Sequence, residues 1–208
     1  IQELSAEFKD SNQNIALHAG ELSLGLVPPE YLGWHIRDAI EIAGAKRIGH
    51  GIDISYDPQM FATLAKMRQS DVAVEINLTS NEVILGVSGE NHPISIYLEE
   101  DVPITISTDD EGVSRIDLTN EYLRAVRTYD LDYKTVKGIS RNALQYSFLD
   151  GAALFQNPKN EVLATACSAG LPQDLSEASP CATFISNNEK AKKQWELEKS
   201  FDVFEDSF

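Results

Sequence analysis

The stretch Ile15-Ala16-Leu17-His18-Ala19-Gly20-Glu21 decides how the rest of this chain is interpreted. It begins as a short apolar run, which is typical of a buried strand in a parallel sheet. It ends in His18 and Glu21, an imidazole and a carboxylate that can both face a pocket beyond the carboxyl end of the strand. Alone this pattern is a weak indication of function, but the chain produces similar strand ends three more times.

The three further strands also end in polar, titratable or hydrogen-bonding residues. The strand Arg47–Gly51 contains His50, the strand Val72–Leu78 leads into Thr79-Ser80-Asn81, and the strand Pro103–Thr108 ends in Asp109-Asp110. Helices are predicted after the first three strands, over 29–44, 58–69 and 92–100. Strand and helix alternate every ~25 to 35 residues, which indicates repeated βαβ units and a parallel sheet.

The remaining segments are predicted to be mostly helical or loop-like. Residues 1–14 are polar and are expected to form the end of a helix and a loop, and 111–117 an irregular loop. Helices are predicted over Leu118–Tyr129, Tyr133–Tyr146 and Asn187–Phe204, the last with Trp195 and Phe201 on its apolar side. Between the last two helices the chain is rich in loops.

Composition excludes some classes of partner. The 208 residues carry a net charge of -16, which argues against binding to nucleic acid or to an anionic membrane, because both need a basic face. No apolar stretch approaches the ~20 residues of a membrane span. The two cysteines, Cys167 and Cys181, lie in one loop-rich region, where a local disulfide and two free thiols are both compatible with the sequence.

At one edge of the sheet these strand ends form a partial metal site. His18 and Asp109 would supply a nitrogen and an oxygen ligand, whereas a catalytic zinc site usually has three or more protein ligands. The other two histidines, His35 and His92, lie next to predicted helices and are interpreted as structural. The site is therefore expected to be incomplete within these residues.

Each residue also has a purely structural interpretation. His18 could be a hydrogen-bonded core histidine, His50 a turn residue between two glycines, and Glu21 a solvated loop carboxylate. Asp109 and Asp110 could form an Asx turn or cap a helix. Their joint occurrence at successive strand ends favours a functional site.

Four ordered motifs resemble the carboxyl-terminal half of the adenosine deaminase family of metal-dependent hydrolases: LHAGE, RIGHG, VEINLTSN and ISTDD. Two later segments, LTNEY and RNALQYSFL, also look like that family. The resemblance covers about residues 12–150. It implies an α/β fold in which residues 1–150 form strands five to eight of a (β/α)8 TIM barrel and 151–208 a loop and helical extension that packs on the barrel.

The family's reaction, zinc-dependent hydrolytic deamination of adenosine to inosine and ammonia, implies a role for each motif residue. His18 would ligate zinc, and Glu21 would protonate purine N1. His50 would orient or deprotonate the attacking water. Asp109 would ligate zinc and contact the attacking hydroxide, and Asp110 would hydrogen-bond purine N7.

The sequence departs from the family pattern in two respects. The His-x-His zinc ligands of the first strand are absent, so we expect a fragment of a longer enzyme whose amino-terminal part supplies them as a separate chain. The pair Asp109-Asp110 is followed by Glu111-Gly112-Val113, where many relatives have proline, which leaves open a deaminase of another adenine derivative. A non-catalytic nucleoside-binding or inactive fragment is a further alternative. The sequence is compatible both with an exported, periplasmic or secreted protein and with a cytoplasmic one.

Overall fold

The computed structural model describes residues 14–157, 161–176 and 178–208. The chain divides into two compact units, residues 1–139 and 140–208, which are described separately. The helix end and loop predicted for residues 1–14 lie outside the described residues, apart from Asn14.

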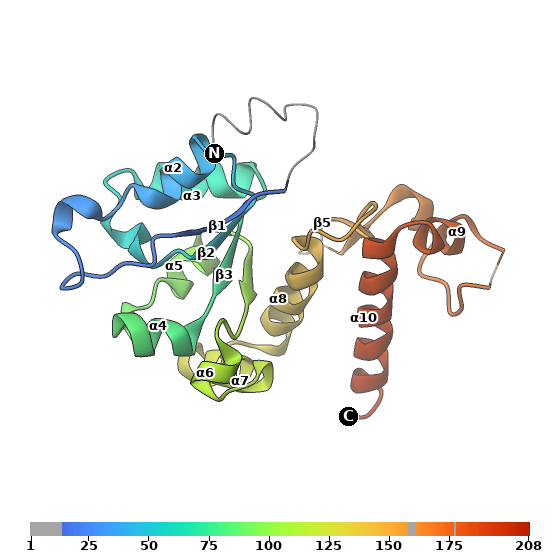
Figure 1. The fold of residues 1–208 in the computed structure, drawn as a ribbon. Helices are drawn as coiled ribbons and strands as arrows, with labels where there is room; N and C mark the ends of the chain where they lie inside the picture. The colour runs from blue at the N-terminus through green and yellow to red at the C-terminus, as the bar shows by residue number, and fades with distance from the viewer. Residues whose placement is uncertain (1–13, 158–160, 177) are drawn as a thin grey trace. The chain divides into compact units, whose positions relative to one another are not determined.

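The first unit is built on a four-stranded parallel sheet (Figure 1). Its strands, β1 (Ala16–Ala19), β2 (Arg47–His50), β3 (Ala73–Ile76) and β4 (Ile104–Ile106), pair in the order β1-β2-β3-β4. The predicted α/β class with a parallel sheet is confirmed. Because spatial order follows sequence order and parallel crossovers are right-handed, the connections lie on the same side of the sheet, as in barrel folds.

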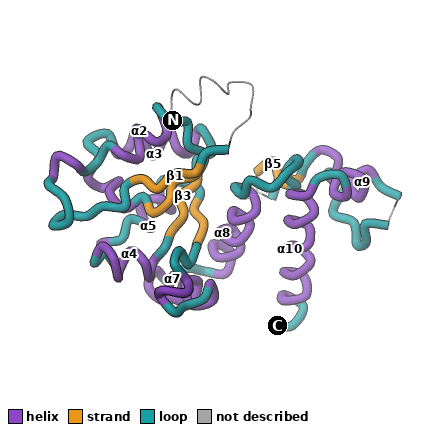
Figure 2. Tube along the Cα trace, in the orientation of Figure 1, coloured by secondary structure: helices purple, strands orange, loops and turns teal. Residues whose placement is uncertain are grey.

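Helices connect and follow these strands (Figure 2, purple). They are α2 (His35–Glu41), α3 (Met60–Gln69), α4 (Leu78–Leu85), α5 (Ile94–Glu99), α6 (Glu111–Ser114), α7 (Leu118–Tyr129) and α8 (Tyr133–Gln145), with short 3-10 turns at Pro29–Tyr31, Ile52–Tyr56 and Gly89–Asn91. In the part of the chain that the structure describes, no helix is both long and apolar enough to span a membrane.

Three details of the sequence prediction are wrong. The helix expected over 29–44 is a 3-10 turn followed by α2, because Gly33 between them is left-handed, with φ +79°. Leu78 does not end a strand but begins α4, and the expected irregular loop after Asp110 contains α6.

The register separates an apolar row from a polar one. Leu17, Ile48, Val74 and Ile104 lie side by side across the four strands. They pack with buried residues of α2, α3 and α5 in one core. The next row is His18, Gly49, Glu75 and Thr105. Glu75, a carboxylate within a strand, has a charged partner, because Arg47 Nε lies 2.6 Å from its Oε1. One face of the sheet is thus an ordinary core, whereas the other carries polar chemistry.

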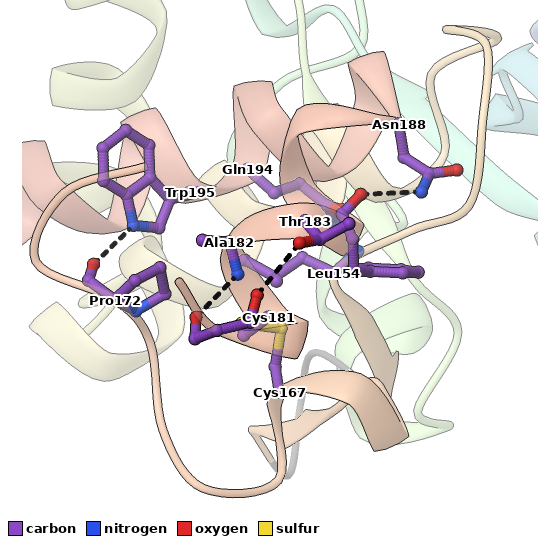
Figure 3. The surroundings of a disulfide bond; sticks show 11 residues. Leu154, Cys167, Pro172, Cys181, Ala182, Thr183, Asn188, Gln194 and Trp195 are labelled. Atoms are coloured by element: carbon purple, nitrogen blue, oxygen red, sulfur yellow. Dashed lines mark hydrogen bonds between the residues drawn. A yellow bond between two sulfur atoms is a disulfide. The ribbon is translucent and has the colours of Figure 1, made fainter. Parts of the chain in front are cut away.

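The second unit has its own small core around a disulfide (Figure 3). It contains the antiparallel strands β5 (Phe155–Asn157) and β6 (Val162–Leu163), a 3-10 turn (Thr165–Cys167), and the helices α9 (Pro180–Ser186) and α10 (Glu189–Glu205). Cys167 and Cys181 are bonded, which decides between the two alternatives left by the sequence. Trp195 of the predicted terminal helix packs on this core, and its indole N–H donates to the Pro172 carbonyl over 3.0 Å.

Candidate functional site

The site is built at the carboxyl ends of the strands, beginning with His18 on β1. In the register His18 lies beside Gly49 of β2. A Cβ at Gly49 would come within 3.0 Å of His18 Cδ2, so the glycine makes room for the imidazole. The side chain of His18 is 67% exposed, which leaves the ring accessible to a ligand.

His50 ends β2 and lies directly across from β1. Its ring is completely buried and meets the His18 ring edge-on, with centroids 4.7 Å apart and planes at 65°. Glu21 approaches both rings, since its Oε2 lies 3.1 Å from His18 Nδ1 and 3.5 Å from His50 Nε2. The sequence motif LHAGE and the strand end RIGHG therefore meet in space.

Asp109 enters the same site from the end of β4. Its Oδ2 lies 3.9 Å from His50 Nε2 and accepts a hydrogen bond of 2.7 Å from the Ser80 hydroxyl. The backbone N–H of Asp109 faces the Ser107 hydroxyl at 3.4 Å. Ser80 of α4 thus fixes the orientation of the carboxylate that the sequence predicts as a ligand.

The structure brings together four of the five predicted site residues: His18, Glu21, His50 and Asp109. The fifth, Asp110, is exposed and stands at the start of α6, where its backbone carbonyl accepts bonds from two residues of that turn.

A metal ion fits part of this arrangement. Ligand atoms of His18, Glu21 and His50 all lie within 4.8 Å of one another. Imidazole nitrogens with a free lone pair and carboxylate oxygens are donor types that zinc prefers. This set differs from the predicted pair, His18 and Asp109, because it contains Glu21 and His50 in place of Asp109.

Sequence reasoning missed a buried carboxylate that supports the loop carrying Glu21. Asp53 accepts a 3.0 Å hydrogen bond from the Gly33 N–H, and its Oδ2 lies 3.3 Å from His35 Nδ1. Burial raises the pKa of Asp53 above the usual aspartate range. Its Oδ1 lies against Gly20, where a Cβ would collide with it. No local sequence signal marks Asp53, whereas Gly20 beside Glu21 marks a tight turn.

Sequence reasoning also set aside His92, which the structure connects to the site. Asn81 lies between the two buried rings, with Oδ1 2.9 Å from His50 Nδ1 and Nδ2 2.8 Å from His92 Nε2. Burial lowers the pKa of His92 to about 4, so this imidazole is neutral near pH 7. The predicted structural role of His92 thus includes a contact with a residue that holds His50.

Comparison with known proteins gives one family. Residues 4–157 match the family model "Adenosine deaminase". An adenosine deaminase of Clostridium perfringens strain 13 is 32% identical over 148 residues, which is 71% of this chain and 41% of that protein. An aminodeoxyfutalosine deaminase of Streptomyces avermitilis is 37% identical over 136 residues, covering 65% of this chain and 35% of the relative.

Solved structures agree with the sequence relatives. The N6-methyl-AMP deaminase of Arabidopsis thaliana superposes with a TM-score of 0.55 at 28% identity, over 69% of this chain and 39% of that one. The chain therefore spans about two fifths of the length of the relatives it matches.

Proposed function

This chain belongs to the adenosine deaminase family, and from that premise we propose that it forms part of the active site of a zinc-dependent aminohydrolase. Its reaction would be the hydrolysis of adenosine, or of a related purine nucleoside, to inosine and ammonia. Water adds to C6 of the purine, the C6–N bond breaks, and the amino group leaves as ammonia.

The observation that carries this proposal is the convergence of His18, Glu21, His50 and Asp109 from the ends of three strands. A sheet needs no titratable groups at these positions, and one of them, the buried ring of His50, is costly to bury without partners. An aminohydrolase needs such groups, because its reaction protonates a ring nitrogen and delivers water to the neighbouring carbon.

Each side chain then has a chemical task. A zinc ion, when bound, lowers the pKa of a water to ~7. His18 and Asp109 would hold it, with the Ser80 hydroxyl orienting the carboxylate. Glu21, 28% exposed, would carry a proton to purine N1, and His50 would align the attacking water.

The position of Asp110 suits substrate rather than metal. It lies at the exposed rim next to Asp109, and we assign it a hydrogen bond to purine N7.

We further propose that the sheet is the carboxyl-terminal half of a (β/α)8 barrel and that another segment, with a His-x-His pair, completes the site. Two observations support this. The strands run in sequential parallel order, and the residues of β1 on the polar side, Ala16 and His18, are exposed whereas β4 is buried throughout. An edge strand of this kind is a natural pairing site for a further strand.

The test combines intact mass under denaturing conditions, zinc content and the ultraviolet change from adenosine to inosine. We expect a second polypeptide with a His-x-His sequence, about one zinc per complete site and turnover. A lone 23.0 kDa species without metal or turnover would refute the proposal and favour an inactive fragment.

Two matched variants separate the roles of the carboxylates. Glu21→Gln is expected to abolish turnover and keep the zinc, whereas Glu30→Gln, at an exposed position in the 3-10 turn between β1 and α2, is expected to change neither. Loss of zinc in Glu21→Gln would instead assign Glu21 as a ligand, in line with its distance from His18.

The second candidate function is deamination of another adenine derivative. It is favoured by the relatives, which include an aminodeoxyfutalosine deaminase and an N6-methyl-AMP deaminase. Turnover of adenosine, N6-methyl-AMP and aminodeoxyfutalosine, measured side by side, distinguishes these substrates. The substrate with the highest kcat/KM is the preferred one.

A further inference from the structure

The chain of contacts behind His50 begins at a group that can only donate a hydrogen bond. The backbone N–H of Ile94, at the start of α5, donates to Nδ1 of His92 over 3.2 Å. The other ring nitrogen, Nε2, faces the Asn81 amide at 2.8 Å, and the far end of that amide faces His50 Nδ1 at 2.9 Å. All the residues in this series of hydrogen bonds are buried.

The donors and acceptors in this series of hydrogen bonds can be matched in only one way. Because Nδ1 of His92 accepts from a backbone N–H, it carries no proton, and a neutral ring then carries its proton on Nε2. That Nε2–H must meet an acceptor. Asn81 therefore has to present its oxygen to His92, which turns its NH₂ group toward His50.

The opposite orientation of the amide creates a conflict. With Oδ1 toward His50 and Nδ2 toward His92, either two N–H groups face each other at Nε2, or the ring proton moves to Nδ1 and opposes the Ile94 N–H. A half-turn of the amide about its terminal torsion exchanges oxygen and nitrogen without moving any other group, and it removes both conflicts.

The consequence reaches the catalytic side of His50. Its Nδ1 accepts from the Asn81 NH₂ group, so the neutral ring carries its proton on Nε2. That nitrogen faces Glu21 Oε2 at 3.5 Å and Asp109 Oδ2 at 3.9 Å. The amide of Asn77 selects neither form, because its Nδ2 is 3.4 Å from one ring nitrogen and 3.5 Å from the other.

The geometry points to Asn81 and His92 as positioning residues that hold His50 in the Nε2–H tautomer. In this form His50 donates a hydrogen bond into the site and has no free lone pair there to take a proton from water. His50 would therefore orient the attacking water and not deprotonate it. This catalytic meaning rests on the proposed function, whereas the tautomer is a property of the chain itself.

Nitrogen-15 NMR of the metal-free 208-residue chain tests the tautomer without any activity measurement. The chain has four histidines, so its ring spectrum holds four patterns, which single His→Gln variants assign. We expect His50 and His92 both to show a protonated Nε2 and an unprotonated Nδ1. A protonated Nδ1 on either ring, or equal populations of the two tautomers, would overturn the inference.

A substitution of Asn81 tests the relay itself. Asn81→Asp replaces the NH₂ donor by an oxygen, so we expect His50 to gain a proton on Nδ1 while His92 keeps its proton on Nε2. The matched control, Asn91→Asp, adds the same charge at an exposed position next to His92 and should leave both rings unchanged.

An unchanged His50 in a folded Asn81→Asp chain would overturn the relay. If that variant does not fold, the wild-type spectrum alone still decides. Absence of zinc or turnover in the complete enzyme would refute the proposed function and leave the NMR result untouched.

Discussion

Lowering the pH is expected to destabilise the first unit through one buried imidazole, His92. Its ring is 2% exposed, and burial lowers its pKa to about 4, with smaller contributions from the charges of Arg124 and His50. The unfolded chain takes up a proton near the ordinary histidine value of 6.5. The folded chain takes it up only near pH 4, so acid favours the unfolded chain across this window.

The size of the effect follows from the two pKa values. No penalty exists above the unfolded pKa, and the penalty grows as the pH falls toward 4. Between about pH 7.5 and about pH 5 the unfolding free energy should fall by about 2 kcal/mol through His92 alone. Asp53 acts in the opposite sense, because its raised pKa stabilises the folded state as acid is added. That contribution is common to wild type and a His92 variant, so it cancels in their difference.

Urea unfolding of a background chain that carries Trp195→Phe measures this difference in unfolding free energy for the first unit alone. Trp34 is then the only tryptophan, and it lies in residues 1–139. We expect His92→Gln to lose about 2 kcal/mol less than the background over the same pH interval. Asn91→Gln, at an exposed neighbouring position, should keep the full pH dependence. Equal pH dependence in His92→Gln and the background would refute the reasoning.

Three further predictions concern stability. Gly20→Ala should cost about 2 kcal/mol or more, because residue 20 is left-handed and its Cβ would collide with Asp53; urea unfolding that matches wild type would contradict this. Asp117→Ala should cost about 1 kcal/mol and Asp117→Asn much less, since the side chain caps α7 by accepting an N–H three residues on; equal melting temperatures for both would exclude a capping role. Reduction of the disulfide between Cys167 and Cys181, 14 residues apart, should cost the second unit about 3 kcal/mol in denaturant unfolding followed by the α10 tryptophan, and an unchanged midpoint would refute this.

The sequence predicts the strands and the amphipathic helices well, because their signals are local. Apolar runs that end in a polar residue locate β1 to β4, although the observed strands are shorter. The helix predicted over Leu118–Tyr129 is found with those bounds, since Asp117 supplies a side-chain cap directly before it. Placing His18, Glu21, His50 and Asp109 at one edge needed only the rule that parallel strands end on the same side.

The start of α4 could not be predicted, because its residues are poor helix formers in isolation. Ser80 and Asn81 favour caps and turns, since their side chains compete for backbone groups. Within α4, Ser80 bonds instead to Asp109, and Asn81 bonds to the rings of His50 and His92. These tertiary partners offset the weak local preference for a helix. The same partners explain why His92 looked structural: its link to His50 runs through a third residue and leaves no spacing signal.

Two strand ends of the candidate site also carry backbone strain, as do five other non-glycine residues among those that the structure describes. His50 and Asp109 have φ values of +69° and +53°, a region that costs a residue with a Cβ about 1 kcal/mol. A side chain in this conformation persists only when its surroundings fix it. His50 is fixed by the Asn81 amide, and the turn after it by the Tyr97 hydroxyl, which donates to the Gly51 carbonyl over 2.6 Å. Asp109 is fixed by Ser80. With both turns in this conformation, His50 Nε2 lies 3.5 Å from Glu21 Oε2 and 3.9 Å from Asp109 Oδ2, so the two strand ends meet at one imidazole.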